Sequence, residues 1–94
     1  MALFAVHYTY DQRTALRDQY RPAHRGYLRE LFADGILLTV GSYPDATRPG
    51  ALLIFKANTA EDVAGRLRSD PFVAQGLVTN ADIREWNVAY GPWA

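Results

Sequence analysis

Short strand-like segments alternate with helix-like segments along this chain, and their order constrains the fold more than any other feature. Segments rich in aromatic, leucine or β-branched residues predict four strands: residues 2–10, 36–43, 51–57 and 82–90. Segments with apolar residues three and four positions apart predict two helices: residues 21–34 and 58–70. The order β-α-β-β-α-β predicts an α+β fold of the ferredoxin-like type, a four-stranded antiparallel sheet with two helices on one face.

The first helix is bounded by a proline and a glycine. Pro22 suits the first turn of a helix, where its missing N–H would have no partner in any case. Gly35 is well suited to the position that follows a helix C-terminus. The segment before the proline, residues 11–20, is compatible with either a loop or a first helical turn.

The second helix is expected to begin after Asn58 or Thr59, which can cap its free N–H groups. The residue before a proline avoids the α-helical region, so Asp70 is expected to end this helix. The same aspartate can cap a further short helical turn, "PFVAQG", which stops at Gly76.

The strands lack the alternation of apolar and polar residues expected for a sheet with one wet face. The runs "LFAV", "ILL" and "ALLIF" are apolar at consecutive positions, so both faces of the sheet should be buried. We expect the face opposite the helices to carry residues such as Phe4, Val6, Tyr8, Leu53 or Phe55. The pattern predicts a homodimer packed through this sheet face, and the alternative is a monomer with an apolar outer face.

Composition narrows the function classes. The chain has 94 residues, which is the size of one domain, and its net charge is zero with no basic stripe, which argues against nucleic-acid binding. It has no cysteine, which excludes disulfides and thiolate metal sites and fits a cytoplasmic protein. No apolar run approaches the roughly 20 residues of a membrane span. No metal-binding spacing, P-loop or dinucleotide fingerprint is present, so we expect no metal and no cofactor.

A titratable imidazole, His24, lies on the apolar stripe of the first predicted helix. It is either a buried core histidine or a proton-transfer group, because histidine titrates near neutral pH. Asp70 likewise has a structural interpretation as a helix cap. Both predicted helices lie on one face of the sheet, so the two side chains can approach each other. An aspartate that accepts the Nδ1–H of a histidine fixes its tautomer and leaves Nε2 as the working base.

Four segments of the sequence resemble the YCII-related (YciI-like) family. They are "RPAH" at 21–24, "GILLTVG" at 35–41, "SDPFVAQGLV" at 69–78 and "IREW" at 83–86. The resemblance covers nearly the whole chain as a single YCII-related domain, residues 1–94. It implies a ferredoxin-like fold that dimerises into a dimeric α/β barrel, with an active site built around a His–Asp pair, here His24 and Asp70.

Candidate substrate-binding residues surround this pair in the sequence. Tyr27 shares a helix face with His24, Phe72 follows the aspartate, and Arg21 or Arg25 could hold a substrate carboxylate. For each of them, a core aromatic or a solvated charge is the alternative role. Ser42 stands where many relatives carry proline, and its hydroxyl either lines the pocket or points to solvent.

The sequence therefore predicts a cofactor-independent enzyme of small-molecule metabolism. His24 would act as general acid or base and Asp70 as its orienting carboxylate. The resemblance suggests elimination, isomerisation or hydrolysis of a small metabolite, including intermediates of aromatic-ring degradation. The alternative is a non-catalytic dimeric module that binds a ligand or serves as an accessory subunit, in which the pair is only a structural hydrogen bond.

Overall fold

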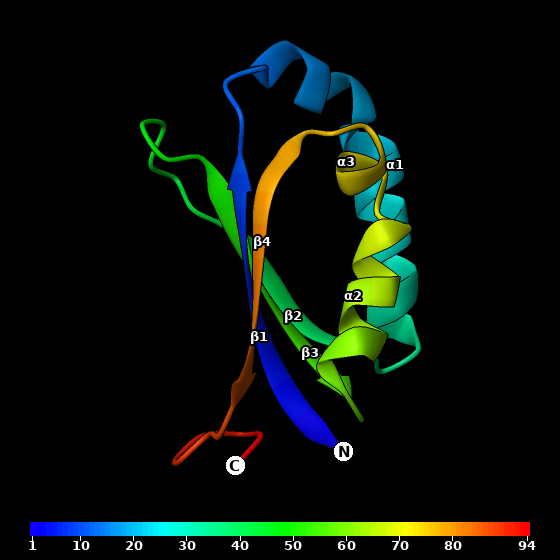
Figure 1. The fold of residues 1–94 in the computed structure, drawn as a ribbon, viewed down its shortest axis with the longest axis vertical. Helices are drawn as coiled ribbons and strands as arrows, with labels where there is room; N and C mark the ends of the chain where they lie inside the picture. The colour runs from blue at the N-terminus through cyan, green and yellow to red at the C-terminus, as the bar shows by residue number, and fades with distance from the viewer.

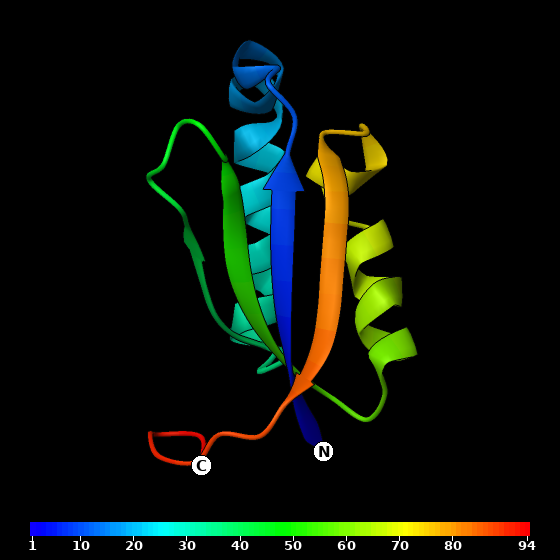
Figure 2. The same ribbon diagram turned by 60° about the vertical axis from the view of Figure 1, so that its left-hand side comes forward.

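The computed structural model describes residues 1–94 and contains one four-stranded sheet with all its helices on one side (Figure 1). The elements follow in the order β1 (Ala2–Tyr10), α1 (Thr14–Ala33), β2 (Leu37–Ser42), β3 (Gly50–Ala57), α2 (Ala60–Arg68), α3 (Pro71–Ala74) and β4 (Val78–Trp86). The strand order is β2-β3-β1-β4 and every neighbouring pair is antiparallel, as Figure 2 shows. The ferredoxin-like βαββαβ fold predicted from the sequence is confirmed.

The first helix is longer than predicted, because α1 begins at Thr14 and Pro22 lies inside it. Proline within a helix removes one backbone hydrogen bond, a cost that packing of the rest of the helix can offset. The sequence pattern left residues 11–20 open between a loop and a helical turn, because the buried residue of these turns is Arg17, whose guanidinium bonds the backbone oxygen of Asp11. The C-terminus matches the prediction: Gly35 has φ +76° and donates to Phe32 O, as in a Schellman motif.

The second helical region agrees closely with the sequence. Thr59 caps α2, since its side chain accepts the N–H of Asp62. Asp70 separates α2 from the short α3 and caps α3, and Gly76 follows α3 with φ +70°. The last strand was predicted four residues too late, because β4 starts at Val78, whose neighbours Thr79 and Asn80 are exposed on an edge strand and carry no apolar signal.

The predicted assignment of the two sheet faces was wrong. Phe4, Val6, Tyr8, Leu53 and Phe55 are at most 3% exposed and face the helices, where they form the core with Leu28, Leu31, Val63 and Leu67. Strand side chains alternate, so a one-residue error in phase exchanges the faces. The outer face instead carries side chains of the intervening positions, which are Leu3, Ala5, His7, Leu52, Ile54, Arg84 and Trp86.

Candidate functional site

Asp70 lies in the layer between the sheet and the helices and has no solvent exposure. It is held there by the sequence "SDPF": the aspartate is extended, Pro71 occupies the first turn of α3, and the Asp70 side chain accepts the N–H of Phe72 at 3.0 Å. The cap is therefore a rigid way of placing a carboxylate inside the protein. The structure confirms the capping role predicted for Asp70. The cap uses Oδ1 only, so Oδ2 is available for another partner.

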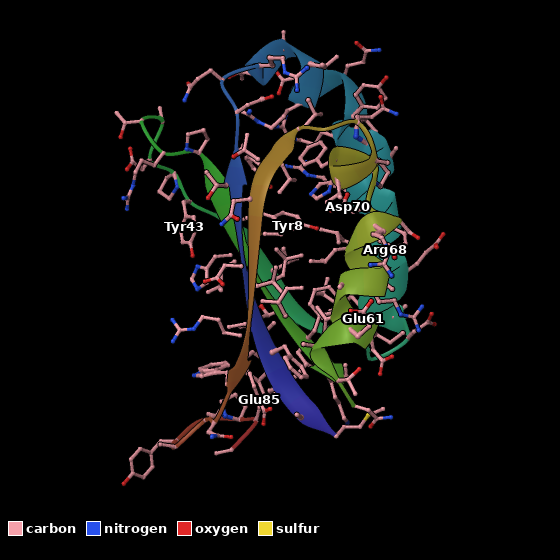
Figure 3. The ribbon with its side chains drawn as sticks, viewed as in Figure 1. Tyr8, Tyr43, Glu61, Arg68, Asp70 and Glu85 are labelled. Carbon is pink, nitrogen blue, oxygen red and sulfur yellow. The ribbon has the colours of Figure 1, made fainter.

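The Asp70 carboxylate accepts two further hydrogen bonds from distant parts of the chain. Oδ1 is 2.7 Å from Nδ1 of His24 on α1, and Oδ2 accepts the hydroxyl of Tyr8 on β1 at 2.8 Å. Figure 3 shows Tyr8 reaching from the sheet across the layer toward Asp70. Three donors from β1, α1 and α3 thus converge on one buried carboxylate and give both of its oxygens a partner.

The Tyr8 hydroxyl is a permanent donor to this carboxylate. Burial, the nearby negative charge of Asp70 and the hydrogen bond to it all raise the pKa of Tyr8 far above its usual value, with burial the largest cause. Tyr8 therefore keeps its proton at neutral pH. Its function at Asp70 is to satisfy Oδ2, since a buried carboxylate oxygen without a partner is costly.

His24 presents its other ring nitrogen to solvent. With Nδ1 donating to Asp70, the lone pair of the neutral ring lies on Nε2. Nε2 has no partner in the protein, and no buried side-chain nitrogen or oxygen lacks one, so this atom is reached by solvent. The His24 side chain is 9% exposed in total, which means that only an edge of the ring is open. The arrangement leaves one ring nitrogen of His24 accessible from outside the protein.

The open edge of His24 belongs to a cleft of about 440 Å³ between α1, α3 and the ends of β1, β2 and β3. Polar and aromatic side chains that line the cleft beside His24 are Tyr10, Arg21, Arg25, Ser42 and Phe72. This volume lies within the range of ordinary small-molecule sites. Arg21 contacts Asp18 one turn earlier, whereas Arg25 has no carboxylate partner. The cleft therefore combines an accessible imidazole nitrogen with an unpaired guanidinium group.

The structure brings together five of the six residues predicted for the site. His24, Asp70 and Phe72 are in mutual contact, and Arg21 and Ser42 line the cleft. Tyr27 does not line it: its hydroxyl donates to the carbonyl oxygen of Arg66 at 2.7 Å, so this side chain ties α1 to α2. A position three residues after His24 lies on the same side of the helix but one turn further along its axis.

Sequence reasoning missed two tyrosines of the site, Tyr8 and Tyr10. Both lie on the helix-facing side of β1, in the row of alternate side chains that begins with the apolar Phe4. Their hydroxyl groups are the polar atoms of this row. Buried tyrosine hydroxyls usually have a hydrogen-bond partner, so a tyrosine in an inward-facing row was the available signal. The wrong assignment of the sheet faces concealed it.

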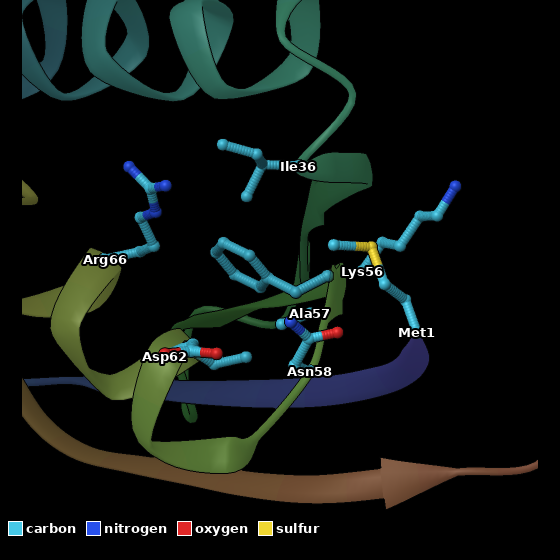
Figure 4. A pocket seen from close by; sticks show the side chains of 9 residues that line it. Met1, Ile36, Lys56, Ala57, Asn58, Asp62 and Arg66 are labelled. Atoms are coloured by element: carbon cyan, nitrogen blue, oxygen red, sulfur yellow. The ribbon is translucent and has the colours of Figure 1, made fainter.

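The other regions of the molecule offer fewer groups that could take part in a reaction. A cavity of about 340 Å³ lies at the far end of the helix–sheet layer, near Met1, and has Lys56, Asp62 and Arg66 but no histidine among its lining residues (Figure 4). No group of three or more His, Asp or Glu side chains is arranged to hold a metal ion. None of the helices has the length and hydropathy needed to cross a membrane.

Fold and site together define a small α+β protein whose buried carboxylate orients a histidine toward a cleft. Comparison with family models matches the YCII-related domain over residues 1–87. The chain therefore belongs to the YCII-related family, as its sequence resemblance indicated.

Among solved structures, the chain is similar to a 5-chloro-2-hydroxyhydroquinone dehydrochlorinase (TftG) from Burkholderia phenoliruptrix AC1100, in a complex with 2,5-dihydroxybenzoquinone. The TM-score is 0.77 and the identity 24%, over 90% of this chain and 93% of that one. At this identity the likeness shows a shared fold. A search of curated proteins found no match.

Proposed function

We propose that the protein is an enzyme that moves a proton on a small metabolite, with His24 as general acid and base and Asp70 as its orienting carboxylate. The observation that carries this proposal is the 2.7 Å contact between Nδ1 of His24 and the sealed carboxylate of Asp70, with Nε2 left free at a cleft. Because Nε2 is reached from the cleft and is not used by the protein, it is available to exchange a proton with a bound molecule.

Each residue of the pair has a defined step. Asp70 accepts a hydrogen bond from Nδ1–H of His24, which keeps its proton, so Nε2 is the nitrogen that takes a proton from the substrate. The imidazolium that forms is stabilised by the adjacent carboxylate. The same Nε2 then returns the proton to a leaving group or to another atom of the substrate. Elimination, isomerisation and water-assisted hydrolysis all fit this sequence, because each needs one group that both accepts and donates a proton.

The substrate is a small molecule with an anionic or strongly polar group. The unpaired guanidinium of Arg25 and the nearby Arg21 provide the geometry for a carboxylate or phenolate, and Ser42 adds a hydroxyl at the rim. The aromatic rings of Tyr10 and Phe72 suit a flat molecule. Because the structurally similar dehydrochlorinase acts on a chlorinated hydroxyhydroquinone, intermediates of aromatic-ring degradation are the first candidates.

The chain offers a matched pair of variants for the test. His24→Gln removes the proposed base, while His7→Gln removes the other histidine, which lies on the outer sheet face and contacts Tyr43. Chloride release from 5-chloro-2-hydroxyhydroquinone and turnover of related hydroxylated rings are measured for both variants and the parent protein. We expect His24→Gln to lose roughly 10²- to 10⁴-fold in rate and His7→Gln to keep the parent rate. Full activity in His24→Gln would refute the proposal.

A non-catalytic ligand-binding module is the second candidate, and the small exposure of His24 favours it. In that case the Asp70–His24 bond only stabilises the fold. Substitution of His24 would then cost stability, on the order of 1–3 kcal/mol for the loss of one partner of a buried carboxylate, and no member of the substrate panel would be turned over by the parent protein.

A further inference from the structure

The ring of Tyr10 is held at the cleft by two neighbouring side chains. It lies at the end of β1, where the guanidinium carbon of Arg17 is 5.0 Å from its ring centroid. The ring of Phe72 meets it nearly perpendicularly, at 88° with 5.6 Å between centroids. Phe72 in turn stacks on His24. The position of the Tyr10 ring is therefore fixed relative to the imidazole through a single intervening side chain.

The hydroxyl of Tyr10 differs from those of the other tyrosines packed around the sheet. Tyr8 donates to Asp70, Tyr27 donates to the carbonyl oxygen of Arg66, and Tyr43 contacts His7. Tyr10 has no such partner, although it is only half-exposed. No buried side-chain oxygen lacks a partner, so this hydroxyl is open to solvent. A fixed ring with a free hydroxyl is pre-organised to bind something outside the protein.

The hydroxyl belongs with the His24 cleft. Tyr10 also borders a wider cleft on the side of Tyr43 and Arg48. Its ring packs against Phe72, and both side chains line the cleft of His24 together with Arg21. Burial, followed by the charge of Asp70, raises the pKa of Tyr10 to about 12, while Arg17 and Arg21 act in the opposite direction. The group is therefore a hydrogen-bond donor at neutral pH.

We propose that the Tyr10 hydroxyl donates a hydrogen bond to the substrate oxygen that becomes negative when His24 removes a proton. This inference rests on the proposed function and names the substrate class: a small ring with a carbonyl group adjacent to the carbon that loses the proton. The C–H proton goes to Nε2 of His24, its electron pair forms a C=C bond, and the carbonyl π pair moves onto oxygen. Tyr10 keeps its own proton, and stabilises the oxyanion as such donors do in other enzymes.

The test compares Tyr10→Phe with Tyr43→Phe, each of which removes only one hydroxyl. The affinity for 2,5-dihydroxybenzoquinone, which carries enol and carbonyl oxygens on a ring, is measured by calorimetry on the full chain. Hydrogen bonds to charged groups are strong enough that Tyr10→Phe should bind roughly ten- to a hundredfold more weakly. Tyr43→Phe should bind within about twofold of the parent protein, since substitutions at the surface away from a site have small effects. Thermal unfolding shows whether each variant is folded.

The outcomes separate this inference from the proposed function. Unchanged affinity and turnover in Tyr10→Phe would overturn the role of Tyr10, while loss of turnover in His24→Gln would still support the proton-transfer pair. Weak binding in Tyr10→Phe with full activity in His24→Gln would support Tyr10 as a ligand donor and refute the base. A parent protein that binds neither 2,5-dihydroxybenzoquinone nor simple cyclic enolates would overturn the substrate class inferred here.

Discussion

The imidazole of His24 lies flat against the ring of Phe72, with 3.8 Å between the ring centroids and 3° between the planes. Phe72 is only two residues after Asp70, whose Oδ1 binds Nδ1 of the same imidazole and the backbone N–H of Phe72. A single tight turn thus fixes His24 in two directions: the carboxylate fixes its edge and the phenyl ring fixes its plane. Both restraints keep Nε2 aimed at the cleft.

Phe72→Leu should disturb this orientation while preserving much of the apolar volume. We expect the free energy of unfolding to fall by roughly 1–2 kcal/mol, since the site is buried and a smaller side chain leaves a partial void. Turnover should fall more than ligand affinity, because a freed imidazole spends less time in the reactive orientation. Phe32→Leu is the control, since Phe32 is 60% exposed on the same helix as His24 and should change stability by less than about 0.5 kcal/mol.

Tyr8→Phe tests how much the hydrogen bond from Tyr8 to the buried Asp70 carboxylate stabilises the fold. The substitution keeps the buried ring but removes the donor to Oδ2, so a carboxylate oxygen with no access to water loses its partner. We expect a loss of about 1–3 kcal/mol in the free energy of unfolding, measured by urea denaturation at pH 7. Tyr43→Phe removes a hydroxyl on the exposed side of the sheet (Figure 3) and should cost far less. Equal losses in the two variants would contradict the importance of the Tyr8–Asp70 bond.

Stability should decline at alkaline pH because burial raises the pKa of tyrosines, most of all of Tyr8 and Tyr10 and to a smaller extent of Tyr27. Tyr8 and Tyr10 have pKa values raised above the ordinary value of 10.0, to about 12 for Tyr10, with burial as the first cause. Above pH 10 the unfolded chain releases these protons while the native protein retains them. The unfolded state then binds fewer protons, so the free energy of unfolding falls as pH rises.

This contribution is fully present below pH 10, and the part due to Tyr10 is lost between pH 10 and about 12. Urea denaturation from pH 8 to 11.5 measures the slope, which should be shallower in Tyr8→Phe and Tyr10→Phe than in the parent protein. Tyr43→Phe provides the comparison for loss of a tyrosine on the outer face. A slope unaffected by the Tyr8 and Tyr10 substitutions would show that these groups titrate normally in the native state.

The tautomer of His24 can be observed without any substrate. Since Nδ1 lies 2.7 Å from Asp70 Oδ1, the neutral ring should carry its proton on Nδ1. Nitrogen-15 chemical shifts of the ring at alkaline pH distinguish the two tautomers. Asp70→Asn replaces the acceptor by an amide and should reduce the population of the Nδ1–H form, whereas the signals of His7 should not change. An Nε2–H tautomer in the parent protein would remove the basis for Nε2 as a base.

Local patterns allowed much of this fold to be predicted, and their failures have physical causes. The span of β1 and the cap at Asp70 depend on neighbouring residues, so the sequence indicates them directly. The start of α1 depends on Arg17, which is buried through its stem and its bonds to Asp11, a tertiary effect that residue type does not show. The sequence also did not indicate which residues of β1 and β3 face the helices, because consecutive apolar residues fit either face of a sheet.

The His24–Asp70 pair could be predicted because the fold brings the two helices to one face. The third partner, Tyr8, could not be placed once the faces had been exchanged. Its contact with Asp70 joins residues 62 positions apart, and only the sheet register determines it. The free hydroxyl of Tyr10 likewise becomes visible only when every other donor and acceptor has been assigned.

The outer sheet face predicts self-association, although its residues differ from those expected from the sequence. Leu3, Ala5 and Leu52 are half-buried there, and Trp86 remains 39% exposed at the edge. We propose that two copies pack through this face, and we expect light scattering to give a mass of about 21 kDa, twice the 10.5 kDa of one chain.

Leu52→Glu places a charge at the centre of the face and should yield monomers, because an unpaired buried charge is costly. Phe32→Glu alters an exposed aromatic on α1, away from the sheet, and should leave the mass unchanged. A parent protein of 10.5 kDa in solution would instead establish a monomer with an apolar outer face.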